Sequence, residues 1–216
     1  MNFHIVTLFP ESMDSYINSS IIKRAITDKK ISVKFYNPRD FANNKHNKVD
    51  HKPYGGGPGM VIQAEPVIKA VEKAKGKKQK VKIYFTDPSG KEFTTEIAKT
   101  SAKKYKDIII ICGRYEGIDS RIKKIFNMED ISIGDYVLTG GELPALVMMD
   151  TISRQVKGVL GNELSREEDR ISSSDVYTRP ETFKYKGKNY DVPKVLLNGN
   201  HADIDAWRTA NRKNNQ

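Results

Sequence analysis

The sequence is poor in the residues that crosslink a chain or hold a metal. Its 216 residues include one cysteine, Cys112, so an internal disulfide and a thiolate zinc site are both excluded. The four histidines, at positions 4, 46, 51 and 201, are scattered and form no HExxH pattern, which argues against a metalloenzyme. Cys112 follows an apolar run, 108–111, and we expect it to be a small buried residue at a strand end.

Long apolar runs are also missing. No stretch reaches the length of a membrane span, and the N-terminal residues lack a basic segment followed by a long apolar one. We therefore expect a cytoplasmic protein with no membrane partner. The chain has 37 basic and 27 acidic residues, a net charge of +10. This excess favours a polyanionic partner, nucleic acid first, although a solvated lysine-rich surface explains it equally well.

Short β-branched runs alternate with segments of helical spacing. We expect strands at 4–9, 31–36, 81–86, 107–112 and 131–138, with four amphipathic helices between or after them. The alternation predicts an α/β fold with a mostly parallel sheet over residues 1–157. Residues 158–176 lack apolar periodicity and are expected to be a flexible linker. Residues 177–216 form a small C-terminal domain, too short for an independent core.

A glycine-rich segment, Tyr54–Met60, first suggests a phosphate-binding loop. It lacks the Lys-Ser/Thr pair of a P-loop, and Met60 stands where a dinucleotide fingerprint needs its third glycine. ATP and NAD are therefore weak candidates. With Asp50 shortly before it, we interpret the segment as a substrate-facing loop, with a plain surface turn as the alternative.

Three further loops each follow a predicted parallel strand, at 86–90, 113–117 and 138–144. Ligands of open parallel sheets bind outside the carboxyl ends of the strands, where such loops gather. The glycines would let the main chain approach an adenine ring, and Glu116 could meet a ribose hydroxyl or an amine. Each loop alone is explained as an ordinary tight turn. Together the three favour a nucleoside-like ligand.

Two of these loops lie in longer motifs, CGRYEGID at 112–119 and SIGDYVLTGGELPA at 132–145. Both closely resemble the bacterial tRNA (guanine-N1)-methyltransferase family of the SPOUT class. Four other motifs are similar and occur in the same order: LFPE at 8–11, YGGGPGM at 54–60, YTRP at 177–180 and VPxVLLxGNHxxIxxWR at 192–208. The resemblance covers almost the whole chain, from Met1 to about Arg208.

The resemblance implies a fold, a reaction and partners. The fold would be a SPOUT-like α/β domain whose sheet ends in a C-terminal trefoil knot formed by the three loops, followed by a small helical domain. The methyl donor would be S-adenosylmethionine, and the product would carry a methyl group on N1 of the guanine immediately 3′ of the anticodon in tRNA. Members work as homodimers in which each active site is built from both chains. Whether a magnesium ion assists is left open.

The resemblance also assigns site residues. The cofactor pocket would be formed by Tyr84, Phe85, Pro88, Gly113, Tyr115, Glu116, Ile133, Gly134, Asp135, Tyr136, Val137, Leu138, Gly140, Gly141 and Pro144. The substrate would contact Pro58 and Gly59, near Asp50. Asp169, in a Glu-Asp pair, matches the family's general base, and Arg154 matches its partner arginine.

The chain departs from the family in two places. Residues 170–176 form a shorter segment than usual, so Asp175 is a reserve candidate for the base. The C-terminal domain is expected to be truncated, with some tRNA-binding surface missing or moved to Lys73–Lys82. Two alternatives stay open: a SPOUT methyltransferase that modifies another RNA atom, such as a ribose 2′-hydroxyl, and a non-catalytic RNA-binding relative.

Overall fold

The structure is a computed structural model that describes residues 1–161 and 175–211. The chain divides into two compact units, Met1–Gly161 and Asn162–Gln216, and each is considered by itself. None of the helices in the described ranges is long and apolar enough to cross a membrane.

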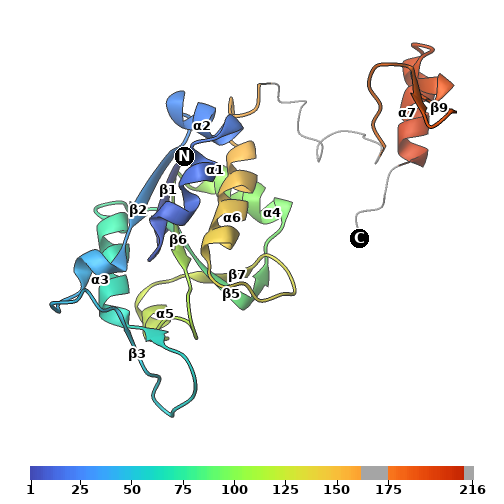
Figure 1. Cartoon of the computed structure of the whole chain (residues 1–216). Helices are drawn as coiled ribbons and strands as arrows, with labels where there is room; N and C mark the ends of the chain where they lie inside the picture. The colour runs from blue at the N-terminus through green and yellow to red at the C-terminus, as the bar shows by residue number, and fades with distance from the viewer. Residues whose placement is uncertain (162–174, 212–216) are drawn as a thin grey trace. The chain divides into compact units, whose positions relative to one another are not determined.

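A five-stranded parallel sheet forms the centre of the first unit (Figure 1). Its strands stand in the order β2-β1-β6-β5-β7 and pair in parallel throughout. Their bounds are β1 Asn2–Val6, β2 Ser32–Tyr36, β5 Val81–Glu92, β6 Asp107–Cys112 and β7 Glu129–Ser132. A short antiparallel pair, β3 Asp50–His51 with β4 Val61–Ile62, lies outside this sheet. The predicted α/β class with a mostly parallel sheet is confirmed.

Helices cover both faces of the sheet. They are α1 Asp14–Ile17, α2 Ser20–Thr27, α3 Ala64–Lys75, α4 Thr95–Lys104, α5 Ile122–Ile125 and α6 Glu142–Arg154. Alternate residues of β6 enter two separate hydrophobic clusters, Ile108 and Ile110 on one face, Ile109 and Ile111 on the other. The first cluster also holds residues of α2, α4 and α6, and the second holds residues of α3 and α5. Burial on both faces explains why this strand is continuously apolar.

Three expected strands have other bounds in the structure. The strand expected at 4–9 spans Asn2–Val6. The strand expected at 131–138 ends at Ser132, because from Ile133 the chain turns back on itself: Tyr136 N donates to Gly134 O at 2.9 Å. The strand expected to end at Thr86 continues to Glu92 with a register shift between Thr86 and Lys91. The shift allows Gly90 to lie against the main chain of Asp130, where a side chain would collide. The expected loop at 86–90 is thus an irregular part of β5.

The second unit contains a hairpin as well as helix. Strands β8 Thr182–Tyr185 and β9 Lys188–Asp191 pair in antiparallel fashion, and a 3-10 turn and helix α7 His201–Ala210 follow. The helix predicted from His201 is confirmed, and the Asn200 side chain caps it by accepting from Ala202 N at 3.1 Å. The domain expected to be helical is therefore mixed in its described part. Most of the expected linker, 158–176, lies outside the described residues.

One buried ionisable group lies in the central sheet. His4 of β1 has Nε2 at 3.0 Å from Asp107 Oδ1 and Nδ1 at 3.1 Å from Tyr36 Oη. A neutral imidazole satisfies both contacts, because it donates from one nitrogen and accepts at the other. Burial lowers the pKa of His4, and this outweighs the opposite effect of its hydrogen bond to Asp107. The folded protein therefore holds His4 neutral more firmly than the unfolded chain does.

This difference predicts a pH-dependent stability. As pH falls below 6.5, the ordinary pKa of histidine, His4 becomes protonated in the unfolded chain while it is still neutral in the folded protein. The free energy of unfolding should therefore decrease from pH 6.5 towards the lowered pKa. His4→Gln should lose this part of the dependence. Urea unfolding between about pH 7.5 and 5.5 measures it, and identical pH profiles for the two proteins would contradict the assignment.

Candidate active site

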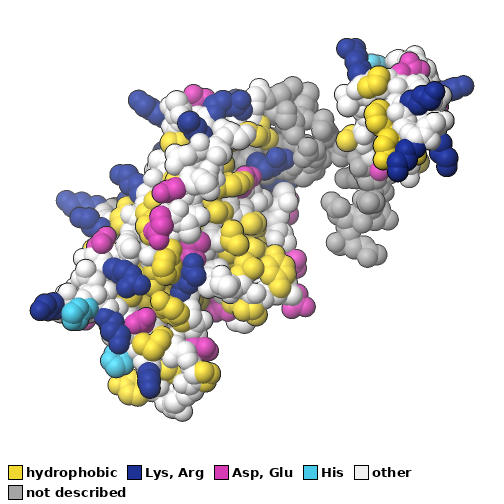
Figure 2. Space-filling view, viewed as in Figure 1, with side chains coloured by type: hydrophobic (Ala, Val, Ile, Leu, Met, Phe, Trp, Pro, Cys, Tyr) yellow, Lys and Arg dark blue, Asp and Glu magenta, His cyan; other side chains and the backbone are white. Residues whose placement is uncertain are grey.

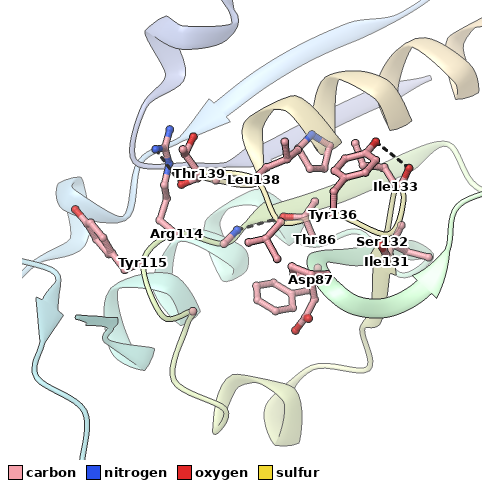
Figure 3. A pocket seen from close by; sticks show the side chains of 18 of the residues that line it. Thr86, Asp87, Arg114, Tyr115, Ile131, Ser132, Ile133, Tyr136, Leu138 and Thr139 are labelled. Atoms are coloured by element: carbon pink, nitrogen blue, oxygen red, sulfur yellow. Dashed lines mark hydrogen bonds between the residues drawn. The ribbon is translucent and has the colours of Figure 1, made fainter. Parts of the chain in front are cut away.

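The loops after the strands line a cavity of about 260 Å³ at the carboxyl end of the sheet (Figure 3). Its walls come from the irregular part of β5, from residues 113–117 after β6, and from residues 131–144 around the start of α6. The volume lies near the lower end of small-molecule sites, about 300 Å³. Because the cavity lies at the carboxyl ends of the strands, it is in the position where ligands of open parallel sheets bind.

Main-chain hydrogen bonds tie these loops together. Gly141 N donates to Gly113 O at 2.8 Å, and Gly113 N donates to Thr86 Oγ1 at 3.2 Å. The same hydroxyl donates to Ile111 O at 3.2 Å. Each loop thus fixes the next, so the polar groups that line the cavity are held in place before any ligand arrives.

Glycine is required where the third loop meets the strand ends. A Cβ added at Gly141 would lie 2.7 Å from both Cys112 Cα and Gly113 N. These atoms belong to buried main chain and cannot move aside as a flexible side chain could. The GG pair of the motif is therefore explained by a close approach of two backbones.

A buried carboxylate joins three of the sequence motifs. Glu142, the first residue of α6, is 4% exposed and accepts from Thr7 Oγ1 at 2.7 Å and from Arg114 Nε at 3.0 Å. The Arg114 guanidinium in turn lies 4.5 Å from the centre of the Phe9 ring. The LFPE, CGRYEGID and TGGELP segments therefore meet at one charge-assisted cluster beside the cavity.

A second carboxylate faces the cavity. Asp87 accepts from Ser89 N at 2.9 Å and from Ser89 Oγ at 2.7 Å, and Lys123 Nζ lies 3.4 Å away. Burial alone would raise the pKa of Asp87, but these donors outweigh it and lower the pKa below its ordinary value. Asp87 is therefore ionised at neutral pH, and its carboxylate, which Lys123 contacts from one side, can face a positively charged group of a ligand.

Most of the residues expected in the pocket line this cavity, namely Phe85, Pro88, Gly113, Tyr115, Glu116, Ile133, Tyr136, Val137, Leu138, Gly140, Gly141 and Pro144. Gly134 and Asp135 belong to the same loop but do not line it. Tyr84 lies elsewhere, because alternate residues of β5 face opposite sides: its ring enters the other core and its hydroxyl is 2.6 Å from Ser101 Oγ. The Tyr115 ring points away from Thr86 and Asp87 in Figure 3.

Several lining residues were not expected from the sequence, among them Thr86, Asp87, Arg114 and Thr139. Position alone could have indicated them, since all lie within or beside the three loops. Their polar roles depend on partners far away in the chain, such as Glu142 and Lys123.

The glycine-rich loop lies against the rim of the cavity. Glu116 N donates to Met60 O at 3.0 Å, and a Cβ at Gly59 would lie 2.6 Å from Glu116 Oε1. This places Gly59, with its exposed neighbour Pro58, beside a cavity-lining side chain. Asp50 lies in β3, opposite Ile62.

Of the two expected catalytic residues, Arg154 lies away from the cavity of its own unit. Arg154 ends α6, ten residues after Pro144, which corresponds to about 15 Å along the helix axis. Asp169 lies outside the described residues, and the reserve candidate Asp175 is an exposed residue of the second unit. In the parts of the chain that the structure describes, no group of three or more His, Cys, Asp or Glu could hold a metal ion.

Comparison with known proteins decides the family. The profile of the family described as tRNA (Guanine-1)-methyltransferase TrmD matches residues 1–216. The chain belongs to this family. The predicted membership is confirmed, and so is the prediction that the chain is an enzyme of the tRNA (guanine-N1)-methyltransferase kind. Membership also implies S-adenosylmethionine as the methyl donor.

Several relatives are similar over nearly the whole chain. A tRNA (guanine-N(1)-)-methyltransferase of Clostridioides difficile is 49% identical over 215 residues, 96% of this chain and 90% of the relative. Proteins of the same name from Campylobacter jejuni subsp. doylei and Staphylococcus epidermidis are 46% and 47% identical, over 97% and 96% of this chain and 91% and 84% of their own lengths. The crystal structure of tRNA (m1G37) methyltransferase from Aquifex aeolicus has a TM-score of 0.79 and 37% identity, and covers 97% of this chain and 88% of its own.

Two family motifs also meet in the second unit. Tyr177 of YTRP and Trp207 of the last motif contact each other edge to face, with ring centres 6.2 Å apart. The motifs that follow the cavity loops in the sequence are thus organised into a small folded unit of their own rather than an extended tail.

The close approach of two backbones at Gly141 predicts that one added methyl group at this position lowers the stability of the fold strongly. Gly141→Ala should lower the free energy of unfolding by about 3 kcal/mol, because the added carbon overlaps buried main chain. Gly161→Ala is the matched control, since a Cβ there meets nothing within 4 Å. Urea unfolding measures both variants, and equal stabilities would show that the loops do not depend on this contact.

Proposed function

We propose that the chain transfers a methyl group from S-adenosylmethionine to N1 of the guanine immediately 3′ of the anticodon in tRNA. The similar Aquifex aeolicus protein is named for this position, as a tRNA (m1G37) methyltransferase. The observation that carries the proposal is the set of interlocked glycine loops around a cavity that the carboxylates of Asp87 and Glu116 help to line.

The cavity fits the methyl donor in shape and in charge. Gly113, Gly140 and Gly141 present bare main chain to it, so peptide N–H and C=O groups are available for the edge of an adenine ring. Asp87 would face the positively charged end of the donor, and Glu116 would meet a ribose hydroxyl. The donor supplies an electrophilic methyl group, and the chain's part is to position it.

The acceptor atom needs a base. Guanine N1 carries a proton in the neutral base and becomes a good nucleophile once that proton is removed. The Asp169 carboxylate would take it, a contribution of about 10²–10⁴-fold in typical enzymes. Arg154 would orient this carboxylate or stabilise the negative charge that develops on O6. The target guanine would leave its stack to reach the cavity.

The position of Arg154 supports an active site shared between two chains. It lies about 15 Å along α6 from the cavity of its own chain. On the same helix Leu143 and Val147 are 60% and 44% exposed, one turn apart. These side chains form an apolar stripe that a second copy of α6 could cover. A homodimer would then bring Arg154 of one chain to the cavity of the other.

The trefoil knot belongs to the same proposal. Its support is the main-chain contact between segments far apart in the chain, where Arg114 pairs with Gly140 and Gly113 bonds Gly141. These contacts are what a backbone threaded through its own loops would need.

A methylation assay on an unmodified tRNA transcript, with mapping of the modified nucleotide, tests the function. We expect N1-methylguanine next to the anticodon, and no methylation when that guanine is replaced by adenine. Methylation of the adenine transcript would instead indicate a ribose-directed enzyme. A chain that binds tRNA without methylating any transcript would be the non-catalytic relative.

Removal of the base predicts a loss of rate without a loss of donor binding. Asp169→Asn should methylate at least about 10²-fold more slowly in single-turnover assays, while calorimetry shows unchanged affinity for S-adenosylmethionine. Asp175→Asn is the matched control and should be near normal. The reverse ranking of the two variants would move the base to Asp175.

The shared active site predicts complementation between two inactive variants. Gly140→Ala should disrupt the cavity wall, because its methyl group would lie 2.3 Å from Arg114 Nε and 2.6 Å from Glu142 Oε2. Arg154→Ala removes the arginine. In a mixed dimer one site would combine an intact cavity with an intact Arg154. Mixing equal amounts should restore about a quarter of wild-type activity. No recovery, although mass spectrometry detects mixed dimers, would place both residues in one chain's site.

A further inference from the structure

The sheet has a second end, opposite the candidate active site. Because all five strands are parallel, each connection from a helix back to a strand returns to the amino ends of the strands. Three such connections follow α2, α3 and α4. They and the last turns before them carry nine exposed lysines, which we call the amino-edge lysines: Lys29, Lys30, Lys73, Lys75, Lys77, Lys80, Lys103, Lys104 and Lys106.

Contacts join the three connections into one surface. The Met1 amino group donates to Lys30 O at 3.0 Å, and Asn2 N donates to Lys106 O at 2.8 Å. Lys80 Nζ lies 5.8 Å from the centre of the Tyr105 ring. The connections after α2, α3 and α4 are therefore neighbours in space.

The surface carries little negative charge. Among the described residues, no ion pair involves any amino-edge lysine. The acidic residues in these segments are Asp28, Glu72 and Asp107. Asp107 accepts from Asn2 Nδ2 at 3.1 Å and contacts His4, with 15% of its side chain exposed. Figure 2 shows dark blue Lys and Arg side chains around α2 and along the margin of the first unit.

Helix capping explains only part of this cluster. Lysines in the last turn of a helix stabilise its carbonyl end, and Lys78 Nζ does donate to Ala74 O at 3.0 Å. Lys77, Lys80 and Lys106, however, lie beyond the helix ends. Like charges gathered on one surface repel one another, and a bound counter-charge relieves that repulsion. The cluster therefore points to a polyanionic ligand.

A groove continues from this surface along α4. Its volume is about 420 Å³, and Lys82, Lys91 and Lys104 line it with the hydroxyl groups of Thr94, Thr100 and Tyr105. Glu129 and Glu96 also line it; Lys82 pairs with Glu129, and Lys99 Nζ lies 3.9 Å from Glu96 Oε1. Lysine and hydroxyl side chains donate hydrogen bonds to phosphate and ribose oxygens.

We propose that the amino-edge lysines and this groove form a second RNA-binding surface, which holds the phosphate backbone of the tRNA at a place remote from the target base. Strand β6 separates the two ends of the sheet, and its length from Asp107 to Cys112 corresponds to about 17 Å. The ligand of the amino edge is therefore not the methylated nucleotide. That the RNA is the substrate tRNA rests on the proposed function.

A charge-reversal pair tests the surface. Lys77→Glu/Lys80→Glu changes two amino-edge lysines, and Lys23→Glu/Lys69→Glu makes the same change in charge on α2 and α3. Fluorescence anisotropy with labelled tRNA measures affinity at several salt concentrations. At about 150 mM salt the amino-edge pair should bind at least about 10-fold more weakly than the control pair, with a shallower salt dependence. Lys77→Arg/Lys80→Arg should bind like the wild type, because it keeps the charge.

Equal affinities of the two charge-reversal pairs would overturn the proposal. Unchanged tRNA affinity with lost retention on phosphatidylserine vesicles would also overturn it and make the surface a membrane contact. Thermal melting confirms that each variant is folded. In methylation assays the amino-edge pair should raise KM and leave kcat unchanged. If the wild type methylates no tRNA, the proposed function fails, while the binding comparison still decides the surface.

Discussion

At Gly141 the loop before α6 touches the ends of two strands, with its N–H 2.8 Å from Gly113 O. This contact fixes the start of α6, and with it the buried carboxylate of Glu142 and the bound Arg114. A larger residue would push the two backbones apart, and the cavity wall would open with them. The cavity therefore depends on a backbone contact, which is how a preorganised cofactor site is expected to be built.

The parallel sheet separates two kinds of electrostatic surface. At the carboxyl ends of the strands, Asp87 and Glu116 face a small cavity. At the amino ends, lysines without acidic partners gather at the connections between helices and strands. A positively charged methyl donor suits the first surface and an RNA backbone suits the second. The methyl donor and part of the RNA backbone would thus bind at opposite ends of the same sheet.

The sequence predicted the parts of the structure that local patterns control. The Ile108–Ile111 run and the helix from His201 lie where periodicity placed them. The expected strand through Leu138 was wrong, because apolar residues there line a cavity instead of a sheet face. Tyr84 shows the same limit: a motif places it in a pocket, but the alternation of β5 turns its ring to the other core. The roles of Asp87 and Arg114 depend on partners 36 and 28 residues away, and no short pattern contains that information. The role of Asp169 as the base was inferred from the family resemblance, because no local pattern around it indicates catalysis.

The proposed function requires that the interlocked loops bind the methyl donor. Isothermal titration calorimetry of the whole chain with S-adenosylmethionine tests it most directly, because it needs neither tRNA nor turnover. We expect saturable heat with one molecule bound per chain, and loss of this heat in Gly140→Ala. Absence of saturable heat in the folded wild-type chain, or binding unaffected by that change, would contradict it.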